Sequence, residues 1–169
     1  RSGDRMSVVA VKIYKNEKIE LCSDSFVGGQ YEQQKVQFVK SFQVNGMTLG
    51  GVGYTTEISL LRIFCKSHQP KSTSEDDITE FFVEFYDWCK KKDSGFKPEN
   101  EWIFIFQGKA FNVYGLGVHP IKEHYAIGAG RYFANAILFV KGSAKEAVNV
   151  ACELSPWCEQ PINSFEVKI

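Results

Sequence analysis

The sequence predicts an α+β protein built as a four-layer αββα sandwich, in which two stacked, mainly antiparallel sheets are flanked by helices. The order of its apolar patterns supports this prediction: strands come first, then two helices, further strands, two more helices and a last strand. The chain has 169 residues, of which 44% are hydrophobic, and this is enough for one domain with a substantial core. The sequence contains no internal repeat and no low-complexity segment.

The first part of the chain predicts two pairs of strands. Residues 7–14 and 18–23 are rich in β-branched and apolar side chains and are separated by a short polar turn. Residues 36–44 and 47–50 form a similar pair, and the Asn45-Gly46 dipeptide between them favours a tight hairpin turn. We therefore expect four strands before the first helix.

Two helices are predicted next. Thr55 or Thr56 can cap a strongly apolar helix that runs to about His68, and Pro70 stops it. A polar loop then leads to a second, amphipathic helix that ends in a run of lysines, which suit the negative end of the helix dipole. The apolar residues at helical spacing are Ile78, Phe81, Phe82, Phe85, Trp88 and Cys89.

The second part of the chain shows the same order of strands followed by helices. Ser143, with Glu146 three residues later, has the spacing of a capping box and marks a helix start. The predicted elements are hairpin strands at 102–106 and 110–114, a strand at 123–127, helices at 132–140 and 143–154, and an edge strand at 164–169.

Composition restricts the environment and the partners. Lys plus Arg equals Asp plus Glu, so the zero net charge favours neither nucleic acid nor a membrane as a partner. The five cysteines are odd in number and lack CxxC spacing, which argues against a disulfide framework and a structural zinc site. The three histidines lack metal-ligand spacing, and we expect no cofactor. With no membrane-spanning run and no signal peptide, we expect a cytoplasmic protein.

The N-terminal end carries the most informative candidate. Residues 1–5 are polar and precede a plausible initiator, Met6, so we interpret them as a remnant of an expression tag, with a short propeptide as the alternative. Residues 6–169 then form a single domain. If Met6 is removed, Ser7 offers a hydroxyl nucleophile together with a free α-amine that can serve as its base.

An ordered set of short segments carries a family resemblance. The segments are Ser7-Val8-Val9-Ala10-Val11, Ser23-Asp24-Ser25, Lys35-Val36, Leu49-Gly50-Gly51-Val52-Gly53 and Ala126-Ile127-Gly128-Ala129-Gly130. In this order and spacing the chain resembles the proteasome β-subunit family, and most closely the bacterial HslV peptidase. The resemblance spans nearly all of residues 6–169, and it implies a fold of the N-terminal-nucleophile (Ntn) hydrolase type.

The resemblance also implies roles for four residues. Ser7 falls near the nucleophile, Asp24 on the aspartate after the second strand, and Lys35 on the lysine that tunes the amine. A buried lysine ammonium lowers the pKa of a neighbouring amine, and Asp24 would keep that lysine charged. Gly53 matches the glycine whose backbone N–H stabilises the oxyanion.

The chain departs from the family pattern in three places. Counting back along the first strand without gaps puts Met6 at the nucleophile position and Ser7 one residue later, so Ser7 needs a shifted register or a bulge to reach the site. Ala129 replaces a serine that usually follows Ile-Gly in the family. The supporting aspartate has no clear counterpart, with Glu153 only nearby.

Three functions remain open at this point. The first is an Ntn peptidase that hydrolyses peptide bonds in unfolded proteins, for which the resemblance implies a homo-oligomeric ring and an ATPase unfoldase partner. The second is a catalytically inactive protein of the same fold with a structural or regulatory role, which Ala129 and the position of Ser7 favour. The third is an amidase that acts on a small molecule, because a fold does not determine its substrate.

Overall fold

The computed structural model describes residues 6–28 and 38–169, and in this part of the chain the strands and helices alternate as the sequence predicts. The strands are β1 (Val9–Tyr14), β2 (Lys18–Ser23), β3 (Ser41–Val44), β4 (Met47–Val52), β5 (Glu101–Phe106), β6 (Lys109–Tyr114), β7 (Gly117–Ile121), β8 (His124–Ile127) and β9 (Asn163–Lys168). The helices are α1 (Thr55–Cys65), α2 (Glu75–Lys92), α3 (Arg131–Phe139) and α4 (Ala144–Leu154).

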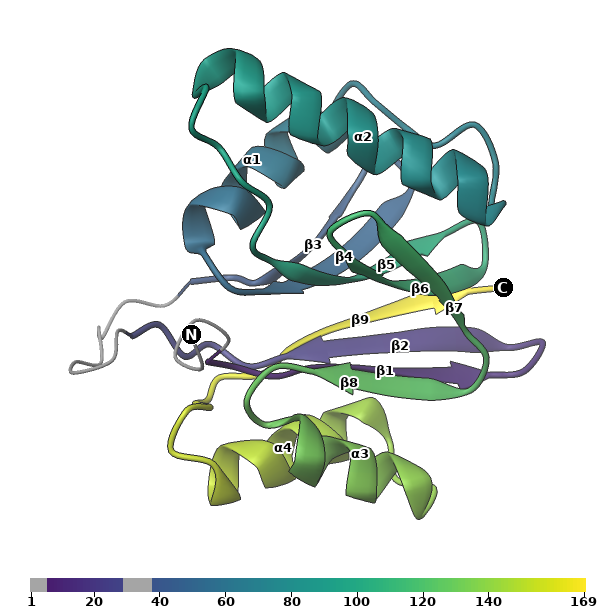
Figure 1. Ribbon diagram of the computed structural model, residues 1–169. Helices are drawn as coiled ribbons and strands as arrows, with labels where there is room; N and C mark the ends of the chain where they lie inside the picture. The colour runs from purple at the N-terminus through teal and green to yellow at the C-terminus, as the bar shows by residue number, and fades with distance from the viewer. Residues whose placement is uncertain (1–5, 29–37) are drawn as a thin grey trace.

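The strands form two antiparallel sheets that stack face to face (Figure 1). One sheet has the strand order β8-β1-β2-β9, and the other has the order β3-β4-β5-β6-β7. Helices α1 and α2 cover the outer face of the five-stranded sheet, and α3 and α4 cover the outer face of the four-stranded sheet (Figure 1). The predicted αββα sandwich is confirmed.

Strand β1 shows why the layers stack in this way. Val9 and Val11 pack between the two sheets, whereas Val8 and Ala10 pack against α3 and α4. Successive side chains of a strand point to opposite faces, so a strand buried on both sides is apolar at every position. A slip of one residue would exchange the two sets, so the burial of both faces fixes the register of β1.

The predicted capping box at the start of α4 is confirmed in detail, because Ser143 and Glu146 make both of its hydrogen bonds. Helix α2 begins at Glu75, within residues 71–77 that the polar pattern predicts as a loop, and the Ser74 side chain caps it by accepting from the Asp77 N–H. Strand β9 lies at an edge of its sheet, beside β2.

Two local predictions were wrong. Tyr54, rather than Thr55 or Thr56, is the N-cap of α1, and its side chain makes no capping hydrogen bond; the helix ends at Cys65. Strand β7 was not predicted, because it contains Pro120, which a sequence pattern takes as a strand breaker. The proline is accepted because β7 lies at the edge of its sheet and pairs only with β6.

Candidate functional site

Ser7 lies just before β1 in an unusual backbone conformation. Its φ is 122°, a value that residues with a side chain rarely adopt, and it is buried, with 2% of its surface exposed. Two glycines of the segment before α3 hold it. The N–H of Gly130 donates to the Ser7 carbonyl oxygen at 3.1 Å, and a Cβ on Gly128 would overlap that same oxygen. The close approach of backbone to backbone thus stabilises a strained residue, a feature that is common at functional sites.

Lys40 contacts the Ser7 hydroxyl directly. Its Nζ donates to Ser7 Oγ and, at 3.1 Å, to Asp24 Oδ1, and the lysine is 4% exposed. Lys40 lies one residue before β3, where its carbonyl oxygen accepts from the Gly51 N–H of β4 at 3.0 Å. The five-stranded sheet therefore positions the ammonium, and the four-stranded sheet positions the hydroxyl.

Asp24 organises the surroundings of this pair. It is fully buried after the end of β2, and besides Lys40 it accepts from the backbone N–H groups of Val8 and Phe26, both at 3.0 Å, and of Glu159 at 3.1 Å. A buried carboxylate is tolerated only when it is paired and hydrogen-bonded, and here both conditions hold. Asp24 thus fixes the start of β1, the loop after β2 and the loop after α4 around one point.

Burial and the Asp24 carboxylate act in opposite directions on the pKa of Lys40. Removal from water lowers this pKa, and the carboxylate opposes the change by favouring the charged form. The lysine donates to Ser7 Oγ, and a charged lysine at this place lowers the pKa of a neighbouring amine by repulsion. The arrangement is therefore suited to activating Ser7.

Gly53 directly follows β4, whose last residue, Val52, packs toward the segment that holds Ser7. A Cβ on Gly128 would lie 3.1 Å from Val52 Cγ1 and would also overlap the Ser7 carbonyl oxygen. Gly53 has a φ of +127° and precedes α1, so its peptide lies beside the positive end of a helix dipole. This is a suitable place to stabilise a developing negative charge.

The structure brings together Ser7 and Asp24 from the predicted set through their shared contact with Lys40, whereas Gly53 lies against Asn100. Lys35 lies outside the described residues. Lys40, which the sequence analysis missed, holds the position between Ser7 and Asp24 that the family resemblance gives to a lysine. No local pattern singles out Lys40, because it lies just outside β3, and Phe42, two residues later, packs toward α1 and α2 and not toward Ser7.

The expected offset of Ser7 required a shifted register or a bulge. In the structure Ser7 has a positive φ just ahead of the β1 ladder, and its hydroxyl accepts from Lys40 Nζ. Ala129 is half-buried in the segment that holds Ser7, and Glu153 is exposed on α4. The backbone N–H of Glu159 supports Asp24 from the same side of the molecule as α4.

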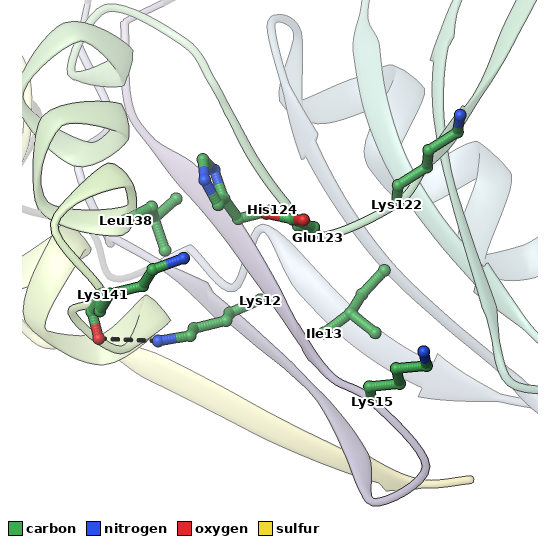
Figure 2. A pocket seen from close by; sticks show the side chains of 8 residues that line it. All are labelled: Lys12, Ile13, Lys15, Lys122, Glu123, His124, Leu138 and Lys141. Carbon is green, nitrogen blue, oxygen red and sulfur yellow. Dashed lines mark hydrogen bonds between the residues drawn. The ribbon is translucent and has the colours of Figure 1, made fainter.

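One hollow formed by described residues lies elsewhere. It measures about 510 Å³ at the opposite end of β1 and β8, and Lys12 reaches across it to donate to the carbonyl oxygens of Lys141 and Gly142 at 2.8 and 2.7 Å (Figure 2). These carbonyls directly follow the C-cap of α3, Val140, so the ammonium lies near the negative end of the helix dipole. Lys12 therefore has a structural role and is not evidence for a ligand. Nor do the described residues contain a group of three or more His, Cys, Asp or Glu that could hold a metal.

Two stacked antiparallel sheets between helix pairs, with β1 in the middle of one sheet, define the Ntn hydrolase fold of the proteasome β-subunit and HslV type. Solved structures share it over almost the whole chain. BPH from Thiobacillus denitrificans in complex with epoxomicin superposes with a TM-score of 0.83 at 16% identity, covering 95% of this chain and 98% of that chain. A second structure of the same BPH gives a TM-score of 0.80 at 16% identity, over 95% and 97% of the two chains.

A eukaryotic HslV from Trypanosoma brucei matches with a TM-score of 0.72 at 16% identity, covering 96% of this chain and 99% of that chain. No protein-family model matches the sequence, and no curated protein matches it. The likeness is therefore one of fold. In the described part of the chain, none of the helices has both the length and the apolar character needed to cross a membrane.

Proposed function

We propose that the protein is an Ntn peptidase that hydrolyses peptide bonds of unfolded polypeptides. The observation that carries the proposal is the contact of Lys40 Nζ with Ser7 Oγ, just ahead of β1, where the family resemblance implies a nucleophile. A buried lysine of lowered pKa, paired with a fully buried aspartate, has a clear chemical use when a hydroxyl lies against it.

The residues divide the reaction between them. Ser7 Oγ attacks the carbonyl carbon of the peptide bond, and its proton passes to the α-amine of Ser7, with Lys40 in contact with the same hydroxyl. Asp24 keeps Lys40 in place, and the Gly53 N–H stabilises the oxyanion. The amine product leaves with a proton, and water then hydrolyses the ester on Ser7. Lys35, which the sequence also indicated, stays a candidate for a supporting role.

This chemistry requires that Met6 is removed. While Met6 is attached, the nitrogen of Ser7 belongs to an amide, which is not a base. The decisive experiment is therefore intact-mass analysis of protein expressed from Met6 without a tag, combined with hydrolysis of an unfolded protein. We expect a mature chain that begins at Ser7 and is active, and a Ser7→Ala variant that is not. Retained Met6 without hydrolysis would exclude this function.

An inactive protein of the same fold is the second candidate. Ala129 favours it, because it replaces a serine of the family pattern in the segment that holds Ser7.

An amidase that acts on a small molecule is the third candidate. An assay that offers small amides and unfolded protein to the same sample tests it, because cleavage of the small amides alone would favour that activity.

Assembly into a homo-oligomeric ring with an ATPase unfoldase as partner is part of the proposal. The described surface offers apolar side chains for subunit contacts, since Tyr132, Phe139 and Val140 of the α3 region are at least 69% exposed. We expect light scattering to give a mass several times that of the 19.2 kDa chain. A monomer at micromolar concentration would contradict the ring.

A further inference from the structure

Asn100 is a fully buried polar residue to which the mechanism above gives no role. It lies one residue before β5, and its side-chain amide binds both main-chain groups of Tyr54. Asn100 Oδ1 accepts from the Tyr54 N–H at 2.7 Å, and Asn100 Nδ2 donates to the Tyr54 carbonyl oxygen at 2.9 Å. This two-point contact fixes the main chain of Tyr54, the N-cap of α1, through the peptide groups on either side of it.

The same amide lies against Gly53. A Cβ on Gly53 would overlap Asn100 Oδ1 and would come within 2.8 Å of Asn100 Cγ, so only a glycine lets the amide approach this closely. The amide also takes up the Tyr54 N–H, which excludes that group as an oxyanion donor. The preceding N–H along the chain is that of Gly53, to which the proposed mechanism gives this purpose.

Glu57 holds Asn100 from the other side. Its carboxylate, 4% exposed in the first turn of α1, accepts from the Asn100 N–H at 3.3 Å and from the Glu99 N–H at 3.1 Å. Burial raises the pKa of Glu57 to about 7, although the two backbone hydrogen bonds act in the opposite direction. The start of α1 and the start of β5 are thus joined by buried hydrogen bonds around the Gly53-Tyr54 turn.

We propose that Asn100 is a positioning residue for the Ser7 site, whose side-chain amide fixes the Gly53-Tyr54 turn and with it the N–H that receives the oxyanion. The inference rests on the proposed peptidase function. Asn100 contacts neither the substrate nor the reacting atoms. It acts by holding the Gly53 N–H in position. Its loss should therefore weaken stabilisation of the transition state more than binding of the substrate.

The test uses Asn100→Ala with Asn112→Ala as the matched control. Asn112 is also buried in the five-stranded sheet, and its amide donates to Glu101 Oε1 and to the Trp102 carbonyl oxygen. Each variant loses a buried amide, but only Asn100 contacts the turn. In the untagged protein we expect Asn100→Ala to lower kcat about 10- to 100-fold with KM changed less than about 2-fold, and Asn112→Ala to leave both near the wild-type values.

Hydrogen exchange supplies a readout that needs no activity. The amides of Gly53 and Tyr54 should exchange faster in Asn100→Ala and not in Asn112→Ala, because only the first opens the turn. If Asn100→Ala does not fold, the pair Asn100→Asp and Asn112→Asp replaces it. Each substitution adds a carboxylate near a glutamate, Glu57 for Asn100 and Glu101 for Asn112. Asn100→Asp keeps the oxygen that accepts from the Tyr54 N–H and loses the Nδ2 group that donates to the Tyr54 carbonyl oxygen.

The outcomes separate the two proposals. An active wild type whose two variants share the same kcat would overturn the role of Asn100 and leave the peptidase standing. Unchanged exchange at Gly53 and Tyr54 would overturn it as well. A wild type that neither hydrolyses peptides nor reacts with an electrophilic probe would instead overturn the peptidase, and the positioning role with it.

Discussion

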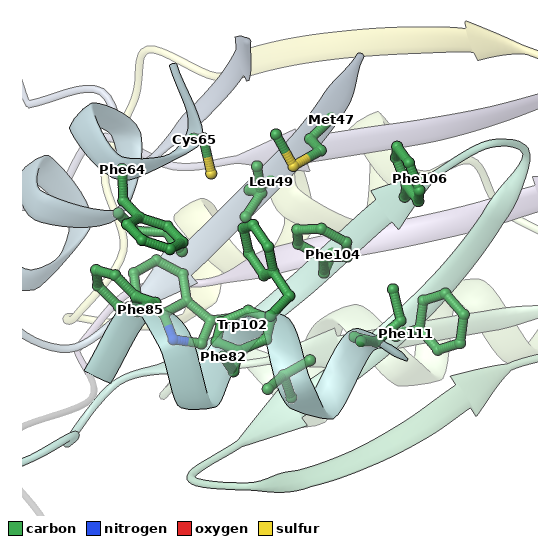
Figure 3. Packing of buried hydrophobic residues seen from close by; sticks show 14 of the residues in the cluster. Met47, Leu49, Phe64, Cys65, Phe82, Phe85, Trp102, Phe104, Phe106 and Phe111 are labelled. Atoms are coloured by element: carbon green, nitrogen blue, oxygen red, sulfur yellow. The ribbon is translucent and has the colours of Figure 1, made fainter. Parts of the chain in front are cut away.

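The two helix–sheet layers of this molecule are packed with opposite kinds of side chain. Between the five-stranded sheet and helices α1 and α2 lies an aromatic layer that includes Phe64, Phe82, Phe85, Trp102 and Phe104 (Figure 3). Its rings meet in tilted and edge-on pairs, often with centroids 5.4 to 5.6 Å apart. Large rings bury much area and contribute about 0.5–1.5 kcal/mol more per pair through their geometry.

The layer between the four-stranded sheet and helices α3 and α4 consists mainly of small residues. Its buried members are Val8, Ala10, Cys22, Ala126, Ala134, Leu138, Ala144, Ala147, Val148, Ala151 and Cys158. Small side chains let backbones approach closely, and this is how Gly130 reaches the carbonyl oxygen of Ser7. The aromatic layer supplies stability, whereas the small-residue layer holds the strained backbone on which the proposed chemistry depends.

The largest expected effect tests the chemistry. Lys40→Met removes the ammonium from Ser7, and we expect peptide hydrolysis to fall on the order of 10⁴-fold, as it does when one member of a catalytic unit is lost. Lys12→Met is the matched control. Lys12 Nζ also donates two hydrogen bonds, to the carbonyl oxygens of Lys141 and Gly142, but it lies at the other end of β1 from Ser7. Equal activity of the two variants would show that Lys40 has no catalytic part.

The next effect tests the aromatic layer. Phe82→Ala empties a fully buried position that contacts Phe81, Phe85 and Phe104, and we expect the free energy of unfolding to fall by about 3–5 kcal/mol. Denaturant titration measures the loss. Activity per folded molecule should stay near the wild-type value, and a loss of activity larger than the loss of folded protein would contradict the division between the layers.

The pH dependence of stability tests Glu57, at the boundary between the aromatic layer and the site. Its folded-state pKa of about 7 exceeds its ordinary value of 4.5, so the protonated form is favoured by folding. The stability that it contributes is complete below about pH 4.5 and is lost as the pH rises through 7, a change of about 3 kcal/mol. Glu57→Gln should remove this dependence, and unfolding curves measured from pH 4.5 to 8 check it. Wild-type and variant stabilities that change in parallel would refute the assignment.

The smallest expected effect tests the small-residue layer. A Cβ on Gly130 would lie 2.6 Å from Cys158 Sγ and 3.0 Å from Ala151 Cβ, so Gly130→Ala overpacks the layer and should cost about 1–3 kcal/mol. We expect activity to fall by more than this stability loss explains, because Gly130 also holds the Ser7 carbonyl. Thermal unfolding and hydrolysis rates measured on the same samples decide the point.

The sequence predicts the layers of this fold well, because the spacing of apolar residues and the turn residues between them are local signals. The αββα order and the capping box at Ser143 depend on residues close together in the chain, and both are confirmed. Asp24 and Gly53 were found through a resemblance in order and spacing. The edge strand that contains Pro120 was not predicted. A strand tolerates a proline only at the edge of a sheet, and the local sequence does not show where the strand lies.

The parts of the site that escaped prediction depend on contacts between distant segments. Lys40 is buried because Asp24, sixteen residues earlier, pairs with it, and no pattern around Lys40 states this. The hydrogen bonds between the Asn100 side chain and the Tyr54 main chain join residues forty-six positions apart. The positive φ of Ser7, which replaces the expected offset, is imposed by glycines more than a hundred residues away. Tertiary structure supplies these features, and local sequence does not encode them.

Reaction with an epoxyketone tests the central claim most directly, because such a probe bonds to a hydroxyl nucleophile and to a free α-amine on the same residue. Untagged protein is incubated with the probe, digested and analysed by mass spectrometry. We predict that the modified peptide begins at Ser7, and that Lys40→Met greatly reduces the modification while Lys12→Met does not. A chain that retains Met6 and takes up no probe at Ser7 would contradict the account.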